Sequence, residues 1–109
     1  MIVIDTNAII YAIQNKIRFE NFVEEEIVVP TSVVSELESL ANSNNDARIA
    51  LRVSSRMKKI QVRSSGDQGV EEAAIKTNSK VITNDLDLRL KLSRAGIITW
   101  TIGRNGVKK

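Results

Sequence analysis

The segment Met1-Ile-Val-Ile-Asp-Thr-Asn7 decides how the rest of the chain is interpreted. Its first four residues are apolar and partly β-branched, a run long enough for a buried strand and too short for a helix. An acid, a hydroxyl and an amide follow directly. A buried strand that ends in such groups points them at the carboxyl edge of a parallel sheet, where open α/β folds bind ligands. Asp5 also suits a helix N-cap, so chemistry at this segment requires partners elsewhere in the chain.

The composition limits the chemistry available to the protein. The chain has 109 residues, a length typical of one domain with its own core. It contains no cysteine and no histidine, which excludes disulfides, thiolates, the usual zinc ligand and every histidine-dependent nucleophile. Catalysis would therefore depend on carboxylates, lysines, hydroxyls or a bound metal. The net charge of +3 mildly favours a polyanionic partner.

No part of the sequence resembles a membrane span or a secretion signal. Apolar runs stay well below the roughly 20 residues that cross a bilayer. Asp5 interrupts the N-terminal apolar segment too early for a signal peptide. We therefore expect a cytoplasmic protein without a membrane partner.

Apolar runs alternate with helical patterns along the chain. We predict strands at residues 1–4, 27–29, 60–62, 80–83 and 97–102, and helices at about 8–13, 17–23, 31–41, 46–59, 67–77 and 84–95. Thr31 or Ser32 is expected to cap the third helix. This alternation predicts an α/β fold, a three-layer α/β/α sandwich with a central, mostly parallel sheet. Residues 1–103 form one predicted domain, and residues 104–109 a basic tail.

Residues 86–93 alternate between leucine and polar side chains, which taken literally is a strand pattern. We nevertheless predict a helix, because leucine, lysine and arginine favour helices and no residue in this segment is β-branched. Asn84, with Asp87 three residues on, resembles a capping box. Gly96 stands where a C-terminal helix cap belongs.

Two predicted strands end in similar chemistry, Ile4-Asp5-Thr6-Asn7 and Ile82-Thr83-Asn84-Asp85. Glu36, beside the apolar stripe of the third helix, and Asp67, at the start of a later one, are expected at the same sheet edge. Four neighbouring carboxylates raise one another's pKa, and a divalent cation relieves this repulsion. Oxygen ligands suit Mg²⁺ or Mn²⁺, which can assist phosphodiester cleavage. The alternative is that the aspartates are ordinary N-caps and the glutamate a solvated helix residue.

Taken together and in this order, the motifs resemble those of PIN domains, a family of small nucleases that depend on magnesium or manganese. The matching segments lie within residues 2–88 and are Ile2-Val3-Ile4-Asp5-Thr6-Asn7, Val29-Pro30-Thr31-Ser32-Val33-Val34-Ser35-Glu36-Leu37, Asp67-Gln68-Gly69-Val70 and Val81-Ile82-Thr83-Asn84-Asp85 followed by Leu86-Asp87-Leu88.

The resemblance implies roles for individual residues. The catalytic and metal-binding acids would be Asp5, Glu36, Asp67 and Asp85, with Asp87 as a further metal ligand. Supporting hydrogen bonds would come from Thr6, Asn7, Thr83 and Asn84. Archaeal relatives often carry two adjacent acids in the third motif, whereas this chain has Gln68 at the second position, followed by a glycine that weakens a helix start. Glu71 and Glu72, one turn further on, are alternative metal ligands.

The function implied is a Mg²⁺- or Mn²⁺-dependent ribonuclease that cleaves single-stranded or loop RNA. The residues of the second and fourth motifs resemble those of ribosomal-RNA-processing PIN nucleases more than those of VapC-type toxins, which an antitoxin holds. This style of motif therefore favours a ribosomal-RNA-processing enzyme. A non-catalytic RNA-binding or assembly module with the same fold stays open, as do a homodimer and a protein partner, either an antitoxin or a ribosome-assembly factor. A phosphatase with Asp5 as nucleophile is disfavoured, because such enzymes carry an acid where this chain has Asn7.

Two clusters of basic residues are candidates for RNA contacts. Of these we favour the one beside the fourth motif, Arg89, Lys91 and Arg94, because its helix begins at the proposed metal edge. The other cluster lies in residues 52–63. Either group could equally be a solvated helix face.

Overall fold

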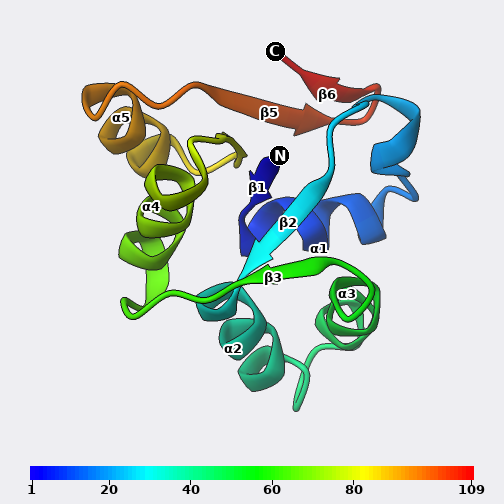
Figure 1. Ribbon diagram of the computed structural model, residues 1–109. Coiled ribbons are helices and arrows are strands. Elements are labelled where there is room, and N and C mark those ends of the chain that lie inside the picture. The colour runs from blue at the N-terminus through cyan, green and yellow to red at the C-terminus, as the bar shows by residue number, and fades with distance from the viewer.

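The computed structural model describes all residues from 1 to 109 and contains one six-stranded sheet in the order β3-β2-β1-β4-β5-β6 (Figure 1). The strands are β1 (Ile2–Ile4), β2 (Ile27–Pro30), β3 (Lys58–Ile60), β4 (Lys80–Ile82), β5 (Thr99–Gly103) and β6 (Gly106–Lys108). The first five strands are parallel to their neighbours, and β6 pairs antiparallel with β5. The predicted α/β class with a mostly parallel sheet is therefore confirmed.

Helices cover both faces of this sheet. They are α1 (Thr6–Gln14), α2 (Thr31–Leu40), α3 (Asn45–Ser54), α4 (Gly66–Thr77) and α5 (Leu86–Arg94), with one 3₁₀ turn at Phe19–Asn21. Successive connections step outward from β1 toward β3, then cross to β4 and continue to β5. Right-handed crossovers in these opposite directions place α1, α2 and α3 on one face and α4 and α5 on the other (Figure 1). The expected three-layer sandwich is the result.

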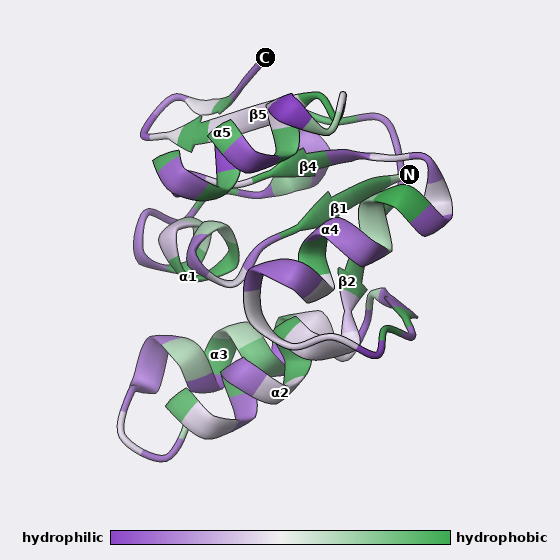
Figure 2. Ribbon diagram, turned by 90° about the vertical axis from the view of Figure 1, so that its left-hand side faces the viewer, coloured by the Kyte–Doolittle hydropathy of each residue, from purple (hydrophilic) through white to green (hydrophobic).

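The central strands are apolar because both of their faces are covered. Every residue of β1 is fully buried, as are Val28 and Val29 of β2 and Val81 and Ile82 of β4. β1 and the buried residues of β2 and β4 are hydrophobic, whereas the helices combine hydrophobic and hydrophilic residues (Figure 2). Twenty-five buried hydrophobic residues form one core. No helix is long and apolar enough to span a membrane.

Residues 86–94 form the helix α5, so the prediction for the alternating leucine segment is confirmed. Its N-cap is Asp85, however, and not Asn84, because the Asp85 side chain accepts a hydrogen bond from the Leu88 amide at 3.2 Å. Gly96 follows the C-cap with a φ of +79°, a left-handed conformation that glycine adopts without strain.

The prediction that Thr31 or Ser32 caps the third predicted helix, α2 in the structure, was wrong. Pro30 occupies the N-cap position of α2 and makes no side-chain cap bond. The Thr31 hydroxyl instead accepts a hydrogen bond from the Val62 amide at 3.1 Å, which ties the start of α2 to the chain that leaves β3. Because Pro30 also ends β2, the chain passes from strand to helix without a loop.

The helix predicted to reach residue 59 ends at Ser54, and the strand expected at 60–62 lies at Lys58–Ile60. Ser54 and Ser55 donate their hydroxyl protons to backbone carbonyls one turn earlier, and such bonds compete with continuation of a helix. The next residues then pair in parallel with β2. The basic tail of the prediction also contains structure, since residues 106–108 form β6.

Candidate functional site

A cavity of about 240 Å³ lies at the carboxyl edge of the sheet, where the crossovers leave β1 and β4 on opposite faces. The four acids that the sequence pointed to, Asp5, Glu36, Asp67 and Asp85, all line it. They come from the end of β1, the middle of α2, the first turn of α4 and the cap of α5. Thr6, Asn7, Ile10 and Leu40 complete the lining.

Asp5 is the buried acid of this group, with 6% of its surface exposed. Its Oδ1 accepts a hydrogen bond from the Thr6 amide, and its Oδ2 accepts one from the Thr83 hydroxyl, both at 2.8 Å. Burial raises the pKa of the Asp5 carboxyl above its ordinary value, and the charges of Asp67 and Glu36 raise it further against the opposing effect of the two hydrogen bonds. Asp5 is thus a fixed carboxylate in an environment that disfavours its charge.

Glu36 is joined to the first motif through Thr6. The Thr6 hydroxyl donates a hydrogen bond to Oε1 of Glu36, so two adjacent groups of Thr6 contact two of the acids. Leu37, which follows Glu36, is completely buried and fixes this turn of α2 against the core. Oε2 of Glu36 makes no hydrogen bond within the protein. Glu36 is therefore held toward the cavity at one oxygen, while the other is free.

Asp67 lies in the first turn of α4, and the N-cap position belongs to Ser65. The expectation that Asp67 is an N-cap was wrong. Desolvation raises the pKa of its carboxyl, and the negative charge of Asp85 raises it further, whereas the Lys91 ammonium lowers it.

Gly69 lies where α4 packs tightly against the start of α2, and this explains the glycine that weakened the third motif in the sequence. A Cβ at this position would overlap the Ser32 side chain and lie 2.7 Å from the Ser64 carbonyl oxygen. Local propensity disfavours glycine in a helix, but this contact between helices requires it. Nothing local in the sequence reveals this role, because it depends on the packing of two distant segments.

Thr83 connects the two aspartates that follow strands. Its hydroxyl donates to Asp5 and accepts a hydrogen bond from the Asp85 amide at 3.1 Å. Asn7 accepts a bond of 3.4 Å from the Asn84 amide, which joins the two motifs a second time.

Of the predicted acids and supporting residues, Thr83 lies behind Asp5 rather than in the cavity lining, and Asn84 and Asp87 lie outside the lining as well. The Asn84 side chain points to β5, where its amide both donates to and accepts from the backbone of Ile102 at 2.8 Å. Asp87 is exposed, and its negative charge contributes to the raised pKa of Asp67. Asn84 therefore supports the site from the sheet, and Asp87 acts on it through charge.

The four acids share a cavity without forming a ready-made ligand set, since no three of them are arranged to hold a metal ion. The donor chemistry nevertheless suits Mg²⁺ or Mn²⁺, because the cavity offers carboxylate oxygens and no nitrogen or sulfur ligand. Burial is the main cause of the raised pKa values of Asp5 and Asp67, and neighbouring carboxylates raise both values further.

The substitute ligands considered for the third motif lie elsewhere. Glu72 accepts hydrogen bonds of 2.9 to 3.1 Å from the backbone amides of Arg63 and Ser64, which lower the pKa of its carboxyl. Neither Glu72 nor Glu71 lines the acid cavity. Glu72 instead holds the loop that leads into α4.

The three basic residues favoured for RNA contacts differ in their surroundings. Lys91 is close enough to Asp67 to influence its pKa. Arg89 is partly buried, and its Nε has no hydrogen-bond partner. Arg94 is exposed near the end of α5. Lys91 is thus the basic side chain of this group that acts on the acids.

Comparison with known proteins agrees with this architecture. A family model described as a PIN-like domain matches residues 2–103. Ribonuclease VapC9 of Archaeoglobus fulgidus is 33% identical over 104 residues, an alignment that covers 87% of this chain and 77% of that protein. A domain of a functionally unknown protein from Methanocaldococcus jannaschii has a similar fold, with a TM-score of 0.73, 21% identity, and coverage of 94% of this chain and 90% of that one.

The matched region contains all four acids and five of the six strands. The structural match supports the fold, and the family model supports the assignment over almost the full length. The chain belongs to the PIN-like domain family.

Proposed function

We propose that this protein is a divalent-metal-dependent ribonuclease whose catalytic acids are Asp5, Glu36, Asp67 and Asp85. The observation that carries the proposal is the cavity at the carboxyl edge that these four carboxylates share. A relative named as a ribonuclease, at 33% identity, supports this assignment. The net positive charge of the chain suits a polyanionic substrate.

Under this proposal the four acids would hold Mg²⁺ or Mn²⁺. Such an ion supplies activation of water and stabilisation of the departing oxygen. Thr6 and Thr83 keep Asp5 in place, so the fixed carboxylate would define where the ion binds. The free Oε2 of Glu36 is suited to accept a proton from the attacking water. Asp87 would assist through its charge.

The biological role of the proposed ribonuclease is argued from its relatives and its motifs. The VapC9 relative favours a toxin-type ribonuclease with an antitoxin partner. The ribosomal-RNA-processing role that the motif style favoured stays a prediction, as do a homodimer, an assembly-factor partner and a cytoplasmic location. A non-catalytic RNA-binding module is the remaining alternative, and the absence of a ready-made ligand set is the observation in its favour.

The proposal predicts that RNA cleavage requires added Mn²⁺ or Mg²⁺ and is lost in Glu36→Gln. The substitution keeps the size of the side chain and its hydrogen bond from Thr6, and removes the charge. Glu38→Gln is the matched control, because Glu38 is an exposed glutamate of the same helix outside the cavity. Cleavage of fluorescent single-stranded and hairpin RNA, with and without chelator, measures the effect.

A contaminating nuclease would cut equally in preparations of wild type, Glu36→Gln and Glu38→Gln. Equal rates in the three proteins, or no cleavage by wild type with Mn²⁺ present, would make the binding module the better assignment. Loss of activity in Glu36→Gln alone would support the nuclease.

A further inference from the structure

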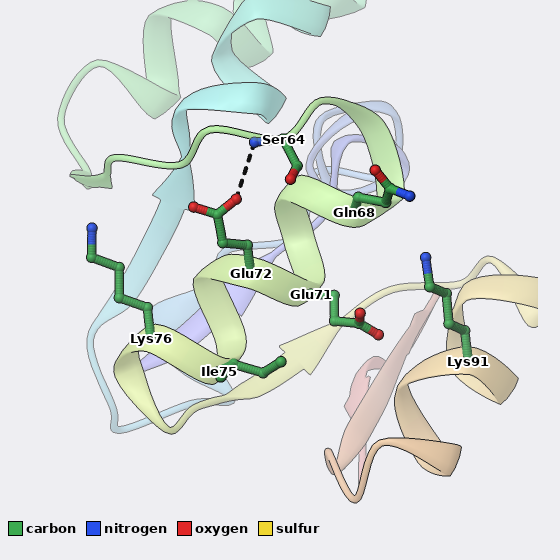
Figure 3. Close-up of a pocket in the computed structure, with 7 residues that line it drawn as sticks. All are labelled: Ser64, Gln68, Glu71, Glu72, Ile75, Lys76 and Lys91. Carbon is green, nitrogen blue, oxygen red and sulfur yellow. Dashed lines mark hydrogen bonds between the residues drawn. The ribbon is translucent and has the colours of Figure 1, made fainter.

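A second hollow lies beside the acid cavity, between α4 and α5. It measures about 560 Å³, and its walls include Gln68, Glu71, Glu72, Ile75, Lys76 and Lys91 (Figure 3). We call it the α4–α5 groove. Five of these residues belong to α4, and Lys91 projects from α5 toward them (Figure 3).

Neighbouring residues connect the groove with the acid cavity. Asp67 lines the cavity, and the next residue, Gln68, lines the groove. The Lys91 ammonium belongs to the groove, yet its charge acts on the Asp67 carboxyl. A polymer with a phosphate at the acids can therefore continue into the groove.

Two groove residues already have structural partners. Glu72 accepts hydrogen bonds from the backbone amides of Arg63 and Ser64, and Figure 3 shows the one from Ser64. The Lys76 ammonium donates to the Gln61 carbonyl at 3.0 Å. Both side chains hold the segment before α4 in place. Their polar groups are therefore already engaged, and we do not assign them to ligand binding.

The other groove residues have no such role. The side chains of Gln68, Glu71 and Lys91 make no hydrogen bond or ion pair with the rest of the protein, although Glu71 and Lys91 project from facing helices (Figure 3). Ile75 is 63% exposed. The groove thus offers a cation, an acceptor carboxylate, an amide and an apolar surface, all without partners.

We propose that the α4–α5 groove binds one nucleotide of the RNA substrate, next to the bond that the acids cleave. Lys91 contacts a phosphate, Glu71 accepts hydrogen bonds from the amino group of the base, and Ile75 packs against the base or sugar. Single-stranded RNA suits this arrangement because its unpaired bases expose their edges. The inference rests on the proposed ribonuclease function, and it adds a base preference to it.

The preference follows from the acceptor chemistry of Glu71. An ionised carboxylate accepts hydrogen bonds and cannot donate them. Cytosine offers it an exocyclic amino group, a pairing that acidic side chains also use in DNA. Uracil has a carbonyl oxygen at that position, which the carboxylate repels. The groove should therefore favour cytosine over uracil.

Binding of 5′-labelled octacytidylate and octauridylate, measured by fluorescence anisotropy, tests this preference. Ca²⁺ replaces Mg²⁺ to suppress cleavage. We expect wild type to bind the cytosine oligomer about tenfold more tightly, the effect of one hydrogen bond to a charged group. Glu71→Gln, whose amide can donate to the uracil carbonyl, should reduce the ratio to near one.

Controls separate the base contact from general electrostatics. Lys91→Ala should weaken the binding of both oligomers to the same degree and leave the ratio of their affinities unchanged. Glu26→Gln alters an exposed glutamate before β2, at the opposite edge of the sheet, and should leave both affinities unchanged.

Equal affinities of wild type for the two oligomers would overturn the subsite, and so would a ratio that survives Glu71→Gln. A failure of either kind leaves metal-dependent cleavage, tested through Glu36, intact. Conversely, Glu71-dependent preference without any cleavage would retain the groove and refute the nuclease.

Discussion

Gly69→Ala tests whether the contact between α4 and α2 positions Asp67. The new methyl group would overlap the Ser32 side chain and lie 2.7 Å from the Ser64 carbonyl oxygen. The carbonyl belongs to the backbone, and Ser32 is a short side chain in the first turn of α2, so neither yields easily. Relief requires α4 to move away from α2, and Asp67 moves with it.

The magnitude is the difference between two opposing effects. Overpacking a tight contact costs about 1–3 kcal/mol. Alanine returns about 1 kcal/mol through its better helix propensity. We expect a net destabilisation of about 1 kcal/mol, which lowers the Tm of a domain of this size by roughly 4–8 °C. Mn²⁺ affinity should fall as well, because one of the four carboxylates is displaced.

Urea unfolding and calorimetric Mn²⁺ titration of the same preparations measure both effects. Gly103→Ala is the matched control, since nothing lies within 4 Å of its added Cβ and its φ is not left-handed. Ser32→Gly, combined with Gly69→Ala, should recover part of the lost stability. If Gly69→Ala is as stable as wild type and binds Mn²⁺ equally well, the close approach has no positioning role.

Two further predictions concern charge. Because the pKa of Asp5 is raised in the folded state, that state binds a proton more readily than the unfolded chain, and metal-free stability should rise as the pH falls from neutral through the raised pKa. Asp5→Asn should lose the part of this pH-dependent gain that comes from Asp5, while the part from Asp67 remains, and it should also lose Mn²⁺ binding. An unchanged pH profile in urea unfolding would contradict the cause assigned here. Arg89→Ala with Lys91→Ala should weaken RNA binding and reduce its salt slope by about 0.7 per lost phosphate contact. An unchanged slope in anisotropy titrations would place the RNA elsewhere.

The strands that could be predicted well are those whose burial on both faces produces a recognisable apolar run in the sequence. β1, β2 and β4 are short apolar runs bounded by polar residues, because both of their faces are covered. β3 has no such pattern, since Lys58 and Lys59 are exposed at the edge of the sheet. Its position follows from pairing with β2, which no local propensity encodes.

The same distinction applies to the candidate site. The carboxyl ends of parallel strands and the starts of the following helices share an edge, so the meeting of Asp5, Glu36, Asp67 and Asp85 could be predicted. The contact of Thr6 with Glu36 could not, because it depends on how α2 is rotated against α1. Neither the proximity of Lys91 to Asp67 nor the requirement for Gly69 has a local signature either.

The paired hydrogen bonds between Asn84 and Ile102 couple β5 to the segment that precedes Asp85 at the acid cavity. The Asn84 amide group imitates a peptide unit and extends the pairing of β4 with β5 by one step past the end of β4. The Ile102 amide proton therefore exchanges with solvent only when the segment that precedes Asp85 opens. Its hydrogen-exchange rate, read by NMR with and without Mn²⁺, would report ion binding from a residue that contacts no ligand.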